Sequence, residues 1–140
     1  MSDKIKYKID HIAHIAVAVN HLDEIKVWEN ILNIKKKSQY ISEEQKVSVI
    51  VFETDGFKIE FMSPTSSDSP ISKFLEKNSS GGIHHICFKT KDLDMTINHF
   101  KSNKIRKITR DSNTKGINKK NICFFHPNDL NNILLELEEE

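Results

Sequence analysis

Apolar residues recur along the chain in continuous runs and in spaced stripes, and the two patterns predict where strands and helices fall. The run His11–Val19 is rich in Ile, Val and Ala, which predicts a strand covered on both faces. Next comes an amphipathic helix, Leu22–Leu32, with Asn20 and Asp23 as candidate caps. Its apolar stripe consists of Leu22, Ile25, Val27, Trp28, Ile31 and Leu32. Three strands are then predicted, with a two-residue Asp55-Gly56 turn joining the last two: Lys35–Ile41, Val47–Thr54 and Phe57–Met62.

The same order of elements recurs in the second half of the chain. A short helix, Pro70–Leu75, and the flexible stretch Ser79–Gly82 separate the two halves. A strand is predicted over Ile83–Thr90, followed by a helix that Asp92 or Asp94 caps and that ends near Ser102. Three more strands complete the pattern: Ile105–Thr109, Asn121–Phe125 and Ile133–Glu138. The polar stretch Asp111–Lys120 between them predicts a mobile loop.

The repeat is visible in individual residues as well as in the order of elements. The run that begins at His14 matches the run that begins at His85, at an offset of 71 (85 − 14). The same offset brings Leu22 onto Leu93. Each half also ends in an apolar strand that contains one glutamate, Glu60 in the first and Glu136 in the second. This pattern indicates an internal duplication.

Composition limits the classes of function that need to be considered. At 140 residues the chain fits one domain, or two small modules that share a core. Its 21 basic and 20 acidic residues leave a net charge of +1, so no global positive field draws in nucleic acid. No run approaches the roughly 20 apolar residues of a membrane helix, and no signal segment is visible, which favours a cytoplasmic location. Cys87 and Cys123 lie in apolar runs and read most simply as free thiols, with a single disulfide as the alternative.

The duplicated histidines and glutamates predict a metal site. A carboxylate flanked by apolar residues is costly to bury without a partner, and Glu60 and Glu136 are both so placed. Two imidazoles and two carboxylates together suit Co²⁺, Mn²⁺, Ni²⁺ or Zn²⁺. Of the seven histidines the offset selects only His14 and His85, and it leaves five to structural or surface roles: His11, His21, His84, His99 and His126. Each histidine or glutamate taken alone also fits an ordinary core or surface position. Cys87 could be a fifth ligand, although a buried thiol is the simpler interpretation.

Several stretches in a fixed order carry a resemblance to a known family. They are Ile9-Asp10, His14–Val19, Lys58–Pro64, Ser69–Lys77, Gly81–Ile86, Phe125–Pro127 and Ile133–Leu137. In these stretches the chain resembles the vicinal oxygen chelate superfamily, and within it the methylmalonyl-CoA epimerases. The resemblance implies an α+β fold in which two paired βαβββ modules form a curved mixed sheet around a metal cup. It implies a single domain over residues 1–140, with one module over about 8–64 and the other over about 80–140.

The resemblance also implies an activity and a ligand set. His14, Glu60, His85 and Glu136 correspond to the metal-site positions, and Glu136 is in addition the candidate for one of the two acid/base roles. Epimerisation of (2R)- and (2S)-methylmalonyl-CoA through an enolate is implied, with an acyl-CoA substrate, a homodimer and a divalent ion. Co²⁺ is the first expectation for that ion, with Mn²⁺, Zn²⁺ or Ni²⁺ as alternatives. Glyoxalase I, or a binding protein of the same fold without catalysis, are the competing hypotheses.

The chain departs from the family pattern at three places. Some epimerases carry a second glutamate on the third strand, and Val49 occupies the matching position here. The loop before the seventh strand is usually glycine-rich, and here it contains only Gly116. The turn after Pro127 reads Asn-Asp-Leu-Asn-Asn where the family often has lysine, serine and two glycines. The second acid/base is therefore not identified from the sequence.

Overall fold

The computed structural model describes residues 9–34, 37–108, 115–116 and 119–140. Its contacts divide the chain into a first unit, residues 14–84, and a second unit, residues 1–13 with 85–140. In the described residues no helix is long and apolar enough to cross a membrane. The predicted mobile loop 111–120 lies mostly outside the described residues.

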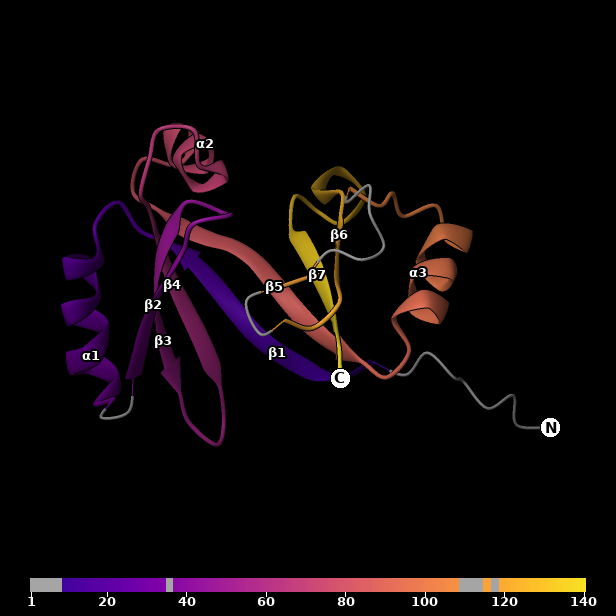
Figure 1. The fold of residues 1–140 in the computed structure, drawn as a ribbon, viewed down its shortest axis with the longest axis horizontal. Helices are drawn as coiled ribbons and strands as arrows, with labels where there is room; N and C mark the ends of the chain where they lie inside the picture. The colour runs from indigo at the N-terminus through magenta and orange to yellow at the C-terminus, as the bar shows by residue number, and fades with distance from the viewer. Residues whose placement is uncertain (1–8, 35–36, 109–114, 117–118) are drawn as a thin grey trace. The chain divides into compact units, whose positions relative to one another are not determined.

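The first unit is a mixed sheet with strand order β2-β3-β4-β1 (Figure 1). Strand β1 pairs in parallel with β4, and the other neighbours are antiparallel. The elements of this part are β1 (Ile9–Ala18), whose first five residues belong to the second unit, the 3-10 turn η1 (Leu22–Ile25), α1 (Lys26–Leu32), β2 (Lys37–Ser42), β3 (Val47–Glu53), β4 (Lys58–Pro64) and α2 (Pro70–Lys77). The predicted order of one strand, one helix and three strands is confirmed.

The second unit repeats the plan with strand order β5-β7-β6, in which β5 and β7 are parallel and β6 is antiparallel to β7. Its elements are β5 (Gly82–Thr90), whose first three residues belong to the first unit, α3 (Leu93–Ser102), β6 (Ile122–Phe125), the 3-10 turn η2 (Pro127–Asp129) and β7 (Leu134–Glu139). Asp92 caps α3, because its side chain accepts a hydrogen bond of 3.0 Å from the backbone of Met95. The predicted α+β class is confirmed.

Two predictions about helix and strand extent are wrong. The apolar stripe over 22–32 does not pack as a whole, since Val27 and Ile31 are 64% and 67% exposed. The segment begins as a 3-10 turn of three residues per turn, which changes the phase of the side chains that follow. In the predicted strand Ile105–Thr109, the described residues form a single bridge, Lys107 to Phe125, and Thr109 lies outside them.

Strand β1 is also less covered than its composition predicts. Ile12 is 51% exposed, and the burial of β1 is confined to its second half. Val17 and Val19 pack with η1 and α1 in one apolar cluster, and Ile12 lies before the part of the strand that this cluster reaches.

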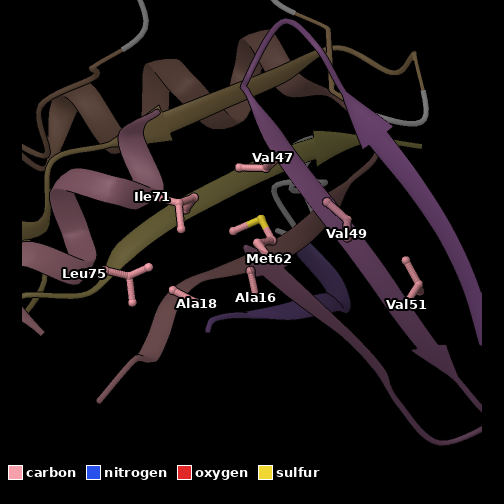
Figure 2. Packing of buried hydrophobic residues seen from close by; sticks show 8 residues of the cluster. All are labelled: Ala16, Ala18, Val47, Val49, Val51, Met62, Ile71 and Leu75. Atoms are coloured by element: carbon pink, nitrogen blue, oxygen red, sulfur yellow. The ribbon is translucent and has the colours of Figure 1, made fainter. Parts of the chain in front are cut away.

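The opposite face of the first unit has its own apolar cluster, which Figure 2 shows. Ile71 and Leu75, one turn apart on α2, pack with the small residues Ala16 and Ala18 of β1. The remaining members come from β3 and β4: Val47, Val49, Val51 and Met62. Helix α2 starts where the sequence predicts, because the Ser69 hydroxyl accepts a hydrogen bond from the backbone of Ile71 and Pro70 occupies the first turn.

Gly81 ends the connection from α2 to β5 in a conformation that requires glycine. Its φ is +80°, and a β-carbon at this position would lie 2.4 Å from the carbonyl oxygen of Ala18. Glycine at position 81 therefore allows the chain to pass close to the end of β1, which lies in the same unit.

Candidate metal centre

The first unit brings His14 and Glu60 together. In the parallel ladder between β1 and β4, Ala16 lies opposite Glu60, so the histidine two residues before Ala16 shares the face of the glutamate. His14 Nδ1 lies 3.4 Å from Glu60 Oε2, and both side chains are buried. Apolar neighbours on this face include Val51, which lies opposite Glu60 on β3. A predicted His–Glu pair therefore exists in this unit.

The second unit brings His85 and Glu136 together by the same register. Cys87 lies opposite Glu136 in the parallel ladder between β5 and β7, and His85 again precedes that residue by two positions. His85 Nε2 lies 3.0 Å from Glu136 Oε1, and both side chains are buried. The offset of 71 that relates His14 to His85 thus also relates Ala16 to Cys87, the residues that face the two glutamates. The two units present their histidine and glutamate from equivalent positions.

The distances and donor types within each pair fit ligands of a common ion. Two atoms bound to one ion at about 2.1 Å lie about 3.0 Å apart at a right angle and about 3.4 Å apart at a tetrahedral angle. The two observed separations, 3.0 Å and 3.4 Å, match these values. Imidazole nitrogen with carboxylate oxygen is a donor set for borderline divalent ions.

Two residues near these pairs, Lys58 and Phe124, were not singled out from the sequence as site residues. Lys58 lies two positions before Glu60 on β4, and its Nζ lies 3.9 Å from Glu60 Oε2. The ring of Phe124 packs edge-on against His85, with ring centroids 5.7 Å apart. The alternation of β4 could have identified Lys58, whereas the Phe124 contact depends on the pairing of β6 with β7.

Gly116, the single glycine of the loop before β6, lies beside the second pair. A β-carbon built on it would lie 3.8 Å from Glu136 Oε2 and 2.9 Å from the side chain of Ile122. The backbone of this loop therefore approaches the glutamate closely, and a side chain there would have to displace Ile122.

The expected departure at the third strand is visible in the structure. Val49 is fully buried in the apolar cluster of Figure 2 and lies opposite Met62. Among the other histidines, His84 packs edge-on against Phe74 with ring centroids 5.2 Å apart, and His11, His21 and His99 are exposed. Cys87 and Cys123 are buried free thiols, so the alternative of a disulfide is wrong.

Comparison with known proteins identifies the family to which this geometry belongs. The model of the glyoxalase/bleomycin resistance protein/dioxygenase superfamily matches residues 13–124. The mitochondrial methylmalonyl-CoA epimerase of Bos taurus is 32% identical over 134 residues, which cover 95% of this chain and 76% of that protein. The chain belongs to the methylmalonyl-CoA epimerase family of this superfamily.

Further relatives and solved structures agree with this assignment. The ethylmalonyl-CoA/methylmalonyl-CoA epimerase of Cereibacter sphaeroides is 33% identical over 132 residues, which cover 94% of this chain and 98% of that protein. The crystal structure of methylmalonyl-CoA epimerase from Mycobacterium tuberculosis has a TM-score of 0.83 at 26% identity, covering 99% of this chain and 92% of that one. A methylmalonyl-CoA epimerase in complex with methylmalonyl-CoA and NH4+ has a TM-score of 0.82 at 27% identity, covering 95% and 96% of the two chains. The superfamily and the fold inferred from the sequence are thereby confirmed.

Proposed function

We propose that this chain is a metal-dependent epimerase that interconverts (2R)- and (2S)-methylmalonyl-CoA. The observation that carries the proposal is the repeated register, in which each unit places one histidine and one glutamate, both buried, at equivalent positions of two parallel strands. Relatives that cover nearly the whole chain are named as epimerases of this substrate, which supports the same reaction here.

The four side chains of the two pairs, His14, Glu60, His85 and Glu136, are proposed to hold one divalent ion jointly. Co²⁺ is the first candidate, and Mn²⁺, Zn²⁺ and Ni²⁺ share the preference for imidazole and carboxylate ligands. When bound, such an ion acts as a Lewis acid that stabilises negative charge on the thioester and carboxylate oxygens of the substrate.

Glu136 is proposed to move the proton. The hydrogen removed is the one on the carbon between the thioester and the carboxylate, and its departure leaves an enolate. The 3.0 Å contact with His85 orients the Glu136 carboxylate, and Phe124 in turn packs against the imidazole of His85. Gly116 brings no side chain toward the glutamate, whereas a β-carbon there would lie 3.8 Å from Glu136 Oε2. Inversion requires a second acid/base on the opposite face of the enolate. Val49 occupies the position at which some epimerases carry a glutamate, and its side chain has no proton to donate.

Two properties of the whole protein are part of the proposal. The epimerase is proposed to be a cytoplasmic homodimer with one metal site for each chain, as the family resemblance implies. Light scattering of the purified protein measures the oligomeric state: a mass of about twice 16.2 kDa supports the dimer, and a monomer mass contradicts it.

Proton exchange in heavy water tests the reaction directly. Incubation of (2S)-methylmalonyl-CoA with the protein and added Co²⁺ in D₂O is expected to yield the (2R) isomer and to replace the α-hydrogen by deuterium. No exchange and no isomerisation would refute the epimerase proposal. Turnover of a glutathione hemithioacetal instead would indicate glyoxalase I, and absence of both reactions would favour a binding protein.

Elemental analysis tests the ligand assignment separately from the reaction. His85→Ala is expected to lose most of the bound metal, because it removes one of four ligands. His99→Ala, a change of the same type at an exposed histidine of the second unit, is expected to keep the metal. Unchanged metal content in His85→Ala would refute the assignment.

A further inference from the structure

The second unit contains a cavity of about 790 Å³ at the end of α3. Its basic side chains come from the last turn of α3 and from the segment that follows it: Lys101, Lys104, Arg106 and Lys107. None of the described side chains that line it is acidic, and none of them belongs to the two His–Glu pairs. We call it the basic cavity. A concave site with this charge is suited to an anion.

The positive charge of the basic cavity is largely uncompensated. Arg106 is paired with Asp129 through two side-chain hydrogen bonds of 3.0 and 3.1 Å, and its backbone N–H donates to the same carboxylate. The pair fixes the guanidinium and neutralises one charge. Within the described parts of the chain, Lys101, Lys104 and Lys107 form no ion pair. Three ammonium groups therefore line the cavity without a carboxylate partner among the described residues.

Lys104 occupies a backbone position that favours glycine. Its φ is +64°, and the hydrogen bond of 3.0 Å from Ile105 N to the carbonyl of Phe100 closes the end of α3 around it. Glycine is the usual residue at such a left-handed helix terminus, and a lysine there is less stable. Backbone strain of this kind recurs at binding sites, where the side chain has a function that offsets it.

His126 contributes a polar atom that the described part of the protein leaves unsatisfied. Its Nδ1 is buried and has no hydrogen-bond partner there, although its side chain lines the basic cavity. The backbone N–H of His126 donates to the carbonyl of Arg106 at 2.8 Å, which holds the residue at the cavity wall. Buried polar atoms in proteins are nearly always hydrogen-bonded, so a turn of the imidazole toward the cavity would let a ligand supply the missing partner.

The floor of the basic cavity is apolar, which narrows the class of anion. Ile97, Ile105 and Phe125 line it, and they belong to or pack against the core cluster of the second unit. An inorganic anion alone would leave this surface uncovered. The volume lies within the range of about 300–1,000 Å³ that is typical of small-molecule sites.

We propose that the basic cavity binds a nucleotide, with its phosphates on the three lysines and His126 and its base on the apolar floor. Phosphate oxygens form charge-assisted hydrogen bonds with ammonium groups, and a planar base covers aliphatic and aromatic side chains. The nucleotide could be the adenosine bisphosphate end of an acyl-CoA or a separate free nucleotide, and both share this chemistry. The site does not depend on the proposed metal ligands.

Calorimetric titration of the full chain with adenosine 3′,5′-bisphosphate and with ADP tests the proposal. Lys104→Gly is expected to weaken binding about fivefold, the loss of one charge-assisted contact, while it raises the melting temperature by relieving the left-handed backbone. Lys119→Gly is the matched control. It removes the same charge at another left-handed position, φ +61°, outside the basic cavity, and it should leave binding unchanged.

Steady-state kinetics distinguish the two sources of the nucleotide. If Lys104→Gly weakens nucleotide binding and raises the KM for methylmalonyl-CoA by a similar factor at constant kcat, the ligand is the nucleotide end of the substrate. If binding weakens and KM does not change, the ligand is a free nucleotide. Failure of both nucleotides to bind the wild-type chain at millimolar concentration, or equal weakening by Lys104→Gly and Lys119→Gly, would overturn the proposal. Binding is measured without turnover, so failure of the epimerase proposal leaves this test decisive.

Discussion

Two glutamates on one face of β7 allow the effect of a substitution on catalysis to be compared with its effect on stability. Glu136 and Glu138 are two residues apart, and both are buried. Glu136 contacts His85, whereas Glu138 forms an ion pair with Lys89. Replacement of each by glutamine keeps the shape and removes the charge. The two variants are therefore matched in strand, face and burial, and they differ in the partner that loses its carboxylate.

For Glu136→Gln we expect a loss of kcat of about 10²- to 10⁴-fold at saturating metal, the usual range for removal of a general acid or base. Its stability should change little, because the amide oxygen of glutamine can still accept from the imidazole of His85. This variant is also expected to bind metal more weakly, so the assay must titrate the ion to saturation.

For Glu138→Gln we expect the opposite result. Breaking a fully buried ion pair is destabilising by about 3–5 kcal/mol. Since the side chain of Lys89 remains 21% exposed, the expected loss is smaller, about 1–3 kcal/mol. Urea denaturation measures this loss. The value of kcat should stay within about twofold of the wild type, because neither Glu138 nor Lys89 is assigned a role in proton transfer. Equal losses of kcat in Glu136→Gln and Glu138→Gln would refute the assignment of Glu136 to proton transfer.

Three further predictions concern the surroundings of the site and the surface. Gly116→Val is expected to lower kcat by at least about tenfold without loss of the fold, because the added side chain meets Ile122 and displaces the loop beside Glu136; circular dichroism provides the folding control. Lys58→Gln should bind Co²⁺ about three- to tenfold more tightly in calorimetry, because the ammonium 3.9 Å from Glu60 no longer competes for that carboxylate. The pKa of Asp68 is lowered to about 2, chiefly by the hydrogen bond from Lys46, so its stabilising effect is present above the unfolded value of 3.8 and is lost as the pH falls through about 2. NMR titration of its carboxyl should therefore show no protonation at pH 4, and a midpoint near 4 would contradict the contact.

The duplication was informative in the sequence because it constrained positions in both halves at once. An offset of 71 selected His14 and His85, and the strand registers opposite Glu60 and Glu136 are equivalent. Strand alternation is local, so the face on which each histidine lies follows from the sequence once the strands are identified. The pairing within each unit was thus predictable to the level of single residues.

The failures have physical causes that lie outside local patterns. The stripe over 22–32 was interpreted with one helical period, but a 3-10 turn begins the segment and leaves Val27 and Ile31 exposed. The basic cavity was missed because it depends on how the end of α3 packs beside Phe125, two segments that are distant in the chain. Tertiary packing of this kind leaves no periodic signal in the sequence.

The central claim, one divalent ion held by two matching His–Glu pairs, is tested most directly by a crystal structure of the full chain grown with Co²⁺. Anomalous diffraction at the cobalt edge locates the ion independently of the protein model. The account predicts one strong peak within about 2.3 Å of a donor atom from each of His14, Glu60, His85 and Glu136. A peak bound by only one of the two pairs, or located elsewhere with both pairs unbound, would contradict it.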